Sequence, residues 1–176
     1  MKWSLYDARG RRKYLVPIER DAFLGAAVRI GGPTSTFCAV LVFTGARITE
    51  VLSLTAEMID DANGAINFHT LKRHRRKSGE PPPPTVVVRS VPVPMRLLRH
   101  IELVHQHRER QRSPRLATTR LWEWSRTTGW RRVKVVMLLA RVPGFIAMPK
   151  AVRHAFGAAA TTRNITLSMT QKWLVS

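Results

Sequence analysis

The chain has 176 residues, and its 30 lysines and arginines against 11 aspartates and glutamates give a formal net charge of +19. This length corresponds to one ordinary domain, and 44% hydrophobic residues exclude a disordered basic tail, because such tails lack the apolar side chains that form a core. The positive charge must therefore lie on a folded body, where it attracts polyanions, and nucleic acid is the leading expected partner.

The single cysteine and the hydropathy pattern exclude further classes of protein. Cys38 can form neither an internal disulfide nor a cysteine-based zinc site, so we interpret it as a small core residue in a reducing compartment. The longest charge-free stretch, residues 30–46, contains Gly31, Gly32 and Pro33, which would break a membrane helix. With no signal peptide recognisable in the basic N-terminus, we expect a soluble, cytoplasmic protein with no membrane partner.

Residues 1–16 are predicted to form a flexible basic N-terminal arm. The end of this arm is dense in positive charge: Arg9, Arg11, Arg12 and Lys13. A helix is predicted to begin at Pro17, whose fixed φ suits the first helical turn, and to end at Gly31-Gly32-Pro33.

Two more helices are predicted before residue 55. Thr34 or Ser35 is expected to cap the first of them, whose apolar residues are spaced to bury one side. After a break at Gly45, the second runs from about 46 to 54 and carries Arg47 in its first turn, with Glu50 three residues later on the same flank. Taken alone, this pair is typical of a surface ion pair.

The middle of the chain changes to a β pattern. Residues 65–69 alternate in polarity and residues 85–93 are rich in β-branched side chains, so two strands are predicted. The segment between them carries five basic residues ahead of four prolines, which predicts a stiff basic hairpin loop with Lys72 at its tip. Such a loop, taken alone, is usually solvated. Because two strands are marginally stable, the sheet must pack on the helices.

Helical spacing returns after Met95. Helices are predicted over about 95–112, from Ser125 or Thr127 to near Pro143, from Pro149 onward, and over 167–174. The helix that begins at Ser125 or Thr127 runs through Trp130 and Val133, and the buried positions expected in the helix from Pro149 are Val152, Phe156 and Ala159. The fold class is therefore mainly α (α+β), with one small antiparallel β-sheet.

Phosphate chemistry in this chain would have to rely on arginine and lysine. The sequence has no Gly-rich phosphate loop and no clustered carboxylates that would hold two metal ions. Arg47 at a helix start could bind two phosphate oxygens with its planar guanidinium. Lys150, Arg153 and His154 fall on one helix face because of their i, i+3, i+4 spacing, although His154 could equally be a hydrogen-bonded core histidine.

Three motifs in this order resemble the tyrosine recombinases, or phage integrases. They are Thr44–Leu54 (TGARITEVLSL), Thr70-Leu71-Lys72 ahead of Val91-Pro92-Val93-Pro94, and Pro149–Gly157 (PKAVRHAFG). The resemblance covers about Tyr14 to Leu174. It implies that residues 17–176 form a helical recombinase catalytic domain with a small β-hairpin, that double-stranded DNA and other recombinase subunits are the partners, and that the protein acts in the bacterial cytoplasm or nucleoid.

The resemblance also implies a role for individual residues. Arg47 and Arg153 match the two arginines that clamp the scissile phosphate, Lys72 matches the hairpin general acid, and Lys150 stands where most members have histidine. Glu50 matches the acidic residue that steadies the first arginine, and His154 is expected to support the site. The residues expected to bind DNA are Arg73, Arg75, Arg76, Lys77 and Arg126. No metal or other cofactor is expected, since the arginines supply the charge stabilisation that a cation gives elsewhere.

The nucleophile of the family is not found in this sequence. Members continue after the segment that matches Gln171–Leu174 into Gly-His and then a nucleophilic tyrosine, whereas here Val175-Ser176 follows, and Tyr6 and Tyr14 both precede Arg47. We therefore expect a C-terminally incomplete domain that binds DNA without cutting it alone. The alternatives are a recombinase whose tyrosine is supplied by another subunit and a non-catalytic basic RNA-binding or DNA-binding remnant.

Overall fold

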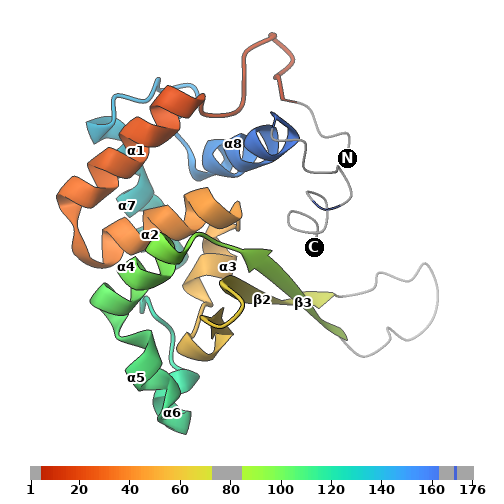
Figure 1. The fold of residues 1–176 in the computed structure, drawn as a ribbon. Coiled ribbons are helices and arrows are strands. Elements are labelled where there is room, and N and C mark those ends of the chain that lie inside the picture. Colours follow the sequence, from red (N-terminus) through yellow and green to blue (C-terminus); the bar gives the residue numbers. More distant parts are fainter. Residues whose placement is uncertain (1–4, 73–84, 163–168, 170–176) are drawn as a thin grey trace.

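The computed structural model describes residues 5–72, 85–162 and 169, and Figure 1 shows helices gathered around a central helix with a small sheet beside them. The elements in chain order are α1 (Pro17–Ile30), α2 (Gly32–Thr44), α3 (Ile48–Leu52), the 3₁₀ turn η1 (Ala56–Met58), β1 (Ile59–Asp60), β2 (Ala65–Lys72), β3 (Thr85–Pro92), α4 (Met95–His105), α5 (His107–Gln111), α6 (Pro114–Ala117), α7 (Arg126–Leu139) and α8 (Pro149–Thr162). The mainly helical fold with one small antiparallel sheet, expected from the sequence, is confirmed.

Helix α2 is the centre of the core. It contacts α1, α3, α4, α7 and α8, and nearly all of its side chains are buried. The expectation of a one-sided apolar face is therefore wrong, since a helix that is apolar all round is enclosed on every side. Cys38 is a core residue as predicted, and burial raises the pKa of its thiol to about 12.

Two helix boundaries differ from the sequence-based expectation. Helix α2 begins at Gly32 and not after Thr34 or Ser35, because Gly31, with φ 74°, reverses the chain within one residue. The helix predicted over 95–112 is interrupted at Gln106, which has φ 51°. This break turns the buried His107 inward, where its ring nitrogens lie 2.8 Å from Asp61 Oδ2 and 2.9 Å from Glu102 Oε2.

Close packing against α2 sets the rotation of α7 about its axis. Trp130 is 46% exposed, and Gly129 faces inward. A Cβ on Gly129 would lie 3.2 Å from the Phe37 ring, so α7 approaches α2 too closely for a larger residue. The predicted cap is confirmed, because Ser125 Oγ accepts a hydrogen bond from the Thr128 N–H.

Helix α8 follows its predicted pattern in part. Val152 is buried as expected, whereas Phe156 is only partly buried. Ala160 takes the buried position expected for Ala159. The helix predicted over 167–174 lies outside the described residues apart from Met169.

The sheet is antiparallel in the order β1-β2-β3, and β1 was not predicted because it has only two residues. The register places Phe68 of β2 directly opposite Arg89 of β3, so the two side chains share a face. The predicted hairpin pairing is confirmed, but Lys72 is the last residue of β2, paired with Thr85, and not at the tip of a loop as expected. Residues 73–84 lie outside the described part of the chain.

The segment before α1 was expected to be a flexible arm, but residues 5–16 form a hydrogen-bonded turn. Tyr6 and Arg12 form an antiparallel bridge, and the Asp7 carboxylate accepts the Arg11 backbone N–H at 2.9 Å. The Arg12 guanidinium also forks onto both oxygens of Glu19 in α1. This ion pair attaches the turn to the first helix and lowers the pKa of the Glu19 carboxyl.

None of the helices in the part of the chain described here combines the length and the apolar character needed to cross a membrane.

The turn at Gly45 joins α2 to α3 and sets the position of α8. Gly45 has φ 60°, and a Cβ built on it would lie 2.6 Å from Cδ1 of Phe156. Figure 1 shows α8 lying alongside α2. Only glycine allows both the backbone conformation and the close approach of the Phe156 ring.

We expect Gly45→Ala to lower the free energy of unfolding by about 3 kcal/mol, because the left-handed backbone costs ~1–2 kcal/mol and the overlap with Phe156 adds a similar amount. Urea unfolding measures the loss. Gly10→Ala is the matched control: Gly10 also has positive φ, 72°, but a Cβ there meets nothing within 4 Å. The control should show the backbone cost alone, and equal losses in the two variants would contradict the packing argument.

Candidate functional site

The Glu50 carboxylate lies among three arginines that come from three separate parts of the fold. Its oxygens are 3.4 Å from Arg47 Nη1, 3.1 Å from Arg89 Nη2 and 3.7 Å from Arg153 Nη1. The same carboxylate accepts the backbone N–H of Arg47 at 2.6 Å and so caps the start of α3. With its side chain only 11% exposed, Glu50 is the shared counter-charge of the cluster.

Arg47 is the N-cap residue of α3, one position earlier than the first-turn placement expected from the sequence. Its backbone is extended, with φ −74° and ψ 153°, so its side chain leaves the start of the helix instead of running along it. The side chain is 50% exposed while its guanidinium lies near Glu50. The backbone of Arg47 is therefore held by Glu50 while its charged guanidinium is accessible to solvent.

Arg153 comes from the first half of α8 and reaches back to the turn before α3. Its Nη1 donates a hydrogen bond of 2.8 Å to the carbonyl oxygen of Gly45. Burial and the nearby positive charge of Arg47 lower the pKa of Arg153 to about 10, against the opposing effect of Glu50. Arg153 is still charged at neutral pH, and an anion bound beside it would relieve part of this repulsion.

Arg89 belongs to this cluster, and the sequence analysis missed it. Its side chain is 5% exposed, and its guanidinium carbon lies 4.8 Å from the centroid of the Phe68 ring on the facing strand. Burial lowers the pKa of Arg89, while Glu50 acts in the opposite direction. The sequence does contain a pattern that indicates this role for Arg89. Val87, Arg89 and Val91 lie on one face of the strand, and an arginine on a face with two valines is expected to be buried and therefore to need a negatively charged partner.

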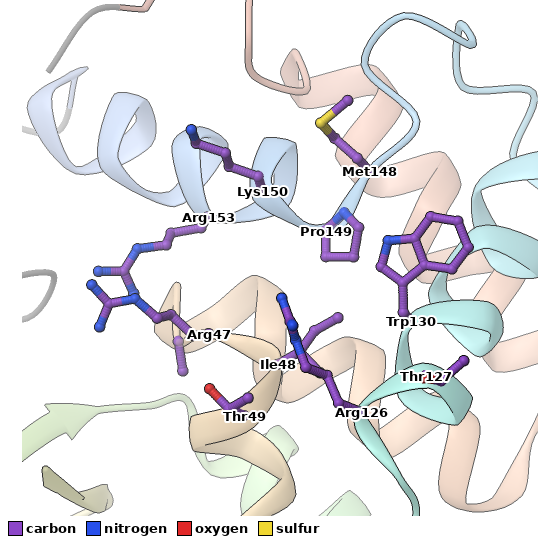
Figure 2. A pocket seen from close by; sticks show the side chains of 11 residues that line it. Arg47, Ile48, Thr49, Arg126, Thr127, Trp130, Met148, Pro149, Lys150 and Arg153 are labelled. Carbon is purple, nitrogen blue, oxygen red and sulfur yellow. The ribbon is translucent and has the colours of Figure 1, made fainter.

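A pocket of about 690 Å³ opens between the start of α3, the start of α7 and the start of α8. Figure 2 shows Arg47 and Arg153 reaching toward each other on one side of it, with Arg126 and Trp130 on the other. The residues that line it are Ala46, Arg47, Ile48, Thr49, Arg126, Thr127, Trp130, Met148, Pro149, Lys150 and Arg153. Four of these are cations and none is a carboxylate, so the pocket suits an anion.

Four predicted site residues therefore meet in this arginine pocket: Arg47, Arg126, Lys150 and Arg153. Arg126 is the first residue of α7, and Lys150 is the second residue of α8. In Figure 2 the Lys150 side chain extends away from Arg47 and Arg153. Lys150 thus lies at the edge of the pocket and not between the two arginines.

The remaining predicted residues lie elsewhere. His154 does not line the arginine pocket; it is buried beside it, and burial together with the charges of Lys150, Lys13 and Arg153 lowers the pKa of its ring to about 4. The backbone of Lys72 stands at the end of β2, opposite Thr85. The predicted DNA-binding residues Arg73, Arg75, Arg76 and Lys77 lie outside the described residues.

Neither tyrosine of the sequence lines the arginine pocket. Tyr6 and Tyr14 pack edge to face, with ring centroids 6.4 Å apart, in the segment that precedes α1. Within residues 5–72, 85–162 and 169, no three side chains of histidine, cysteine, aspartate or glutamate gather as a metal site would require.

Comparison with known proteins finds likeness in structure alone. No protein-family model and no curated protein matches the sequence. Solved recombinase and integrase structures do match, including XerA recombinase, with a TM-score of 0.68 at 18% identity over 92% of this chain and 55% of that chain.

Two further matches come from other systems. The XerH site-specific recombinase bound to its difH substrate gives a TM-score of 0.65 at 16% identity, over 96% of this chain and 52% of that one. The integrase from mycobacterium phage Brujita gives 0.64 at 20% identity, over 94% and 52%. The chain spans about half the length of these structures. The recombinase and integrase fold expected from the three motifs is thus confirmed.

Replacing the shared carboxylate should destabilise the whole cluster. We expect Glu50→Gln to lower the free energy of unfolding by about 3 kcal/mol, because it removes the counter-charge from a buried arginine. Chemical denaturation followed by circular dichroism measures this loss. Glu57→Gln, at an exposed carboxylate seven residues away, should change stability by less than about 0.5 kcal/mol. If both variants behaved alike, Glu50 would not be the residue that holds the arginines together.

Proposed function

We propose that this chain is the phosphate-binding core of a DNA breaking-and-rejoining recombinase, with Arg47 and Arg153 holding one phosphodiester of double-stranded DNA. The observation that carries this proposal is the arginine pocket, which has four cations and no carboxylate in its lining. A phosphodiester carries one negative charge and two free oxygens, and a guanidinium offers two parallel donors that match them.

The geometry supports binding by preorganisation. Glu50 holds both arginines before any ligand arrives, so a phosphate would not have to order two long side chains. Burial, and after it the positive charge of Arg47, lowers the pKa of Arg153, and a bound phosphate would offset the repulsion between the two guanidinium groups. Such preorganised charge is the part of a phosphoryl-transfer site that stabilises the transition state.

Duplex DNA is the proposed ligand because the positive charge extends beyond one phosphate. The formal net charge is +19, and Arg126 extends the cationic lining to the other wall of the pocket. We propose that Lys72 and the basic residues that follow it also contact the DNA backbone. Among the structures that match, the Tn1549 transposon integrase is in complex with transposon right end DNA.

In the proposed reaction a tyrosine oxygen attacks the phosphorus, a new phosphorus–oxygen bond forms, and the bond to the 5′ oxygen breaks. Lys72 is the proposed proton donor to that leaving oxygen, and Arg47 and Arg153 neutralise the charge on the oxygens that do not react. Tyr6 and Tyr14 are outside the arginine pocket, so the attacking tyrosine would come from another segment or another subunit. These 176 residues alone would bind DNA without cutting it.

Loss of a pocket arginine should weaken DNA binding in a way that depends on salt. We expect Arg47→Ala and Arg153→Ala each to reduce affinity about tenfold or more, as the loss of a charged hydrogen bond does. Since both arginines are proposed to hold the same phosphodiester, each variant should make the slope of log affinity against log salt shallower by no more than ~0.9, the value for one phosphate contact. Fluorescence anisotropy with a labelled duplex at several salt concentrations measures both quantities.

The matched control for this experiment is Arg29→Ala, which removes the same charge from an exposed position at the end of α1. It should leave the slope unchanged. If Arg47→Ala and Arg153→Ala bound like the control, the arginine pocket would not be the phosphate site.

Cleavage can be tested with a nicked DNA substrate that traps covalent intermediates. We expect no protein–DNA adduct from the 176-residue chain, because neither of its tyrosines lines the pocket. Denaturing gel electrophoresis after long incubation is the measurement. An adduct that disappears in a Tyr6→Phe or Tyr14→Phe variant would overturn the non-cleaving role of this chain.

A further inference from the structure

A second, smaller pocket lies next to the arginine pocket, between the N-terminal turn and α8. It has a volume of about 300 Å³. Its lining residues are Asp7, Arg11, Arg12, Lys13, Phe145, Ile146, Met148, Lys150, Ala151 and His154. Met148 and Lys150 line both pockets, so the two are neighbours that share a wall.

The charges around this second pocket do not balance. Arg11 pairs with Asp7 at 3.0 Å, and Arg12 forks onto Glu19. Lys13 and Lys150 form no ion pair with a carboxylate in the part of the chain that the structure describes. Two ammonium groups, from the N-terminal turn and from α8, are therefore left to attract an anion.

The turn that carries Lys13 is held in place. The Lys13 backbone N–H donates to the Leu5 carbonyl at 2.8 Å, next to the Tyr6–Arg12 bridge. The Arg11 guanidinium carbon lies 5.8 Å from the centroid of the Phe145 ring, in the loop before α8. The hydrogen bond to Leu5 within the turn and the contact of Arg11 with Phe145 thus hold Lys13 beside α8.

His154 forms part of the wall of the second pocket, close to these positive charges. It is buried, and Lys150, Lys13 and Arg153 all contribute to lowering the pKa of its ring. With the ring neutral, and with Arg11 and Arg12 paired to carboxylates, the two lysines are the lining cations available to a ligand. Phe145 and Met148, 48% and 44% exposed, add an apolar surface of the kind that suits a sugar or a base more than a hydrated inorganic ion.

We propose that this second pocket binds another phosphodiester of the DNA strand whose first phosphate lies in the arginine pocket, with Lys13 and Lys150 as its cations. We assign both phosphates to the same strand because the two pockets share a wall at Met148 and Lys150. A DNA strand that leaves the arginine pocket past Lys150 enters the second pocket. The inference rests on the proposed function, since it assumes that the arginine pocket holds DNA.

The test compares Lys13→Gln with Arg9→Gln. Both substitutions remove one positive charge from the same turn, but Arg9 does not line the pocket. We expect Lys13→Gln to make the salt slope of duplex binding shallower by ~0.9 and to weaken binding about fivefold, whereas Arg9→Gln leaves the slope unchanged. Equal behaviour of the two variants would overturn the second phosphate site.

A second measurement separates a DNA strand from a free anion. Nuclear magnetic resonance titrations would follow the lysine signals with a DNA dinucleotide, which has one phosphodiester, a trinucleotide, which has two, and inorganic phosphate. We expect the trinucleotide to bind more tightly than the dinucleotide in the unmodified chain, and this gain to vanish in Lys13→Gln. If inorganic phosphate shifted Lys13 while the trinucleotide gave no gain, the pocket would be a general anion site and the proposal would be wrong.

The two proposals fail in different ways. If the unmodified chain did not bind duplex DNA, or if Arg153→Ala left binding intact, the proposed function would fail. If Arg153→Ala weakened binding and Lys13→Gln did not differ from Arg9→Gln, only the second phosphate site would fail.

Discussion

The fold and the candidate site both depend on one carboxylate shared by three arginines. Glu50 accepts the Arg47 backbone N–H and lies within 4 Å of guanidinium nitrogens from Arg47, Arg89 and Arg153. These arginines come from the start of α3, from β3 and from α8, so a single negative charge joins three elements that are far apart in the sequence. Without it, three positive charges would be held together in a partly buried place, which is strongly unfavourable.

This arrangement divides the arginines into two kinds. Arg89 is buried against the Phe68 ring and serves the structure, because its side chain keeps Glu50 in place from the sheet side. Arg47 and Arg153 line the pocket and still carry charge that Glu50 alone does not neutralise. Because the positive charge of these arginines is only partly compensated by Glu50, the pocket would attract an anion, as proposed above.

Lys150 belongs to both pockets, so the positively charged surface continues from one pocket to the other. It lines the arginine pocket on one side and the smaller pocket beside the N-terminal turn on the other. The N-terminal turn belongs to this surface because the Arg12–Glu19 ion pair attaches the turn to α1. A segment that composition alone marks as a basic tail is thereby held beside α8, where Lys13 faces the same pocket as Lys150.

Local patterns in the sequence were enough to predict most of the elements. Proline at a helix start, glycine at a break and the change from helical to alternating spacing mark α1, α7, α8 and the β-hairpin, because these signals act within a few residues. The motifs around Arg47, Lys72 and Arg153 were also enough to identify the recombinase fold, which the solved structures confirm. Contacts between distant parts of the chain could not be predicted in this way: Gly129 and not Trp130 faces the core, because α7 packs tightly against Phe37 of α2.

The sequence by itself determined the fold class, the strong attraction to polyanions and the residue types of the candidate site. The tertiary structure alone decided which of these residues meet. Arg89 joins Glu50 because strand register places it opposite Phe68, and His154 falls outside the arginine pocket because its place on α8 puts it in the wall of the smaller pocket. Charge and spacing are local properties that can be read along the chain, whereas a shared counter-charge exists only after separate elements have packed together.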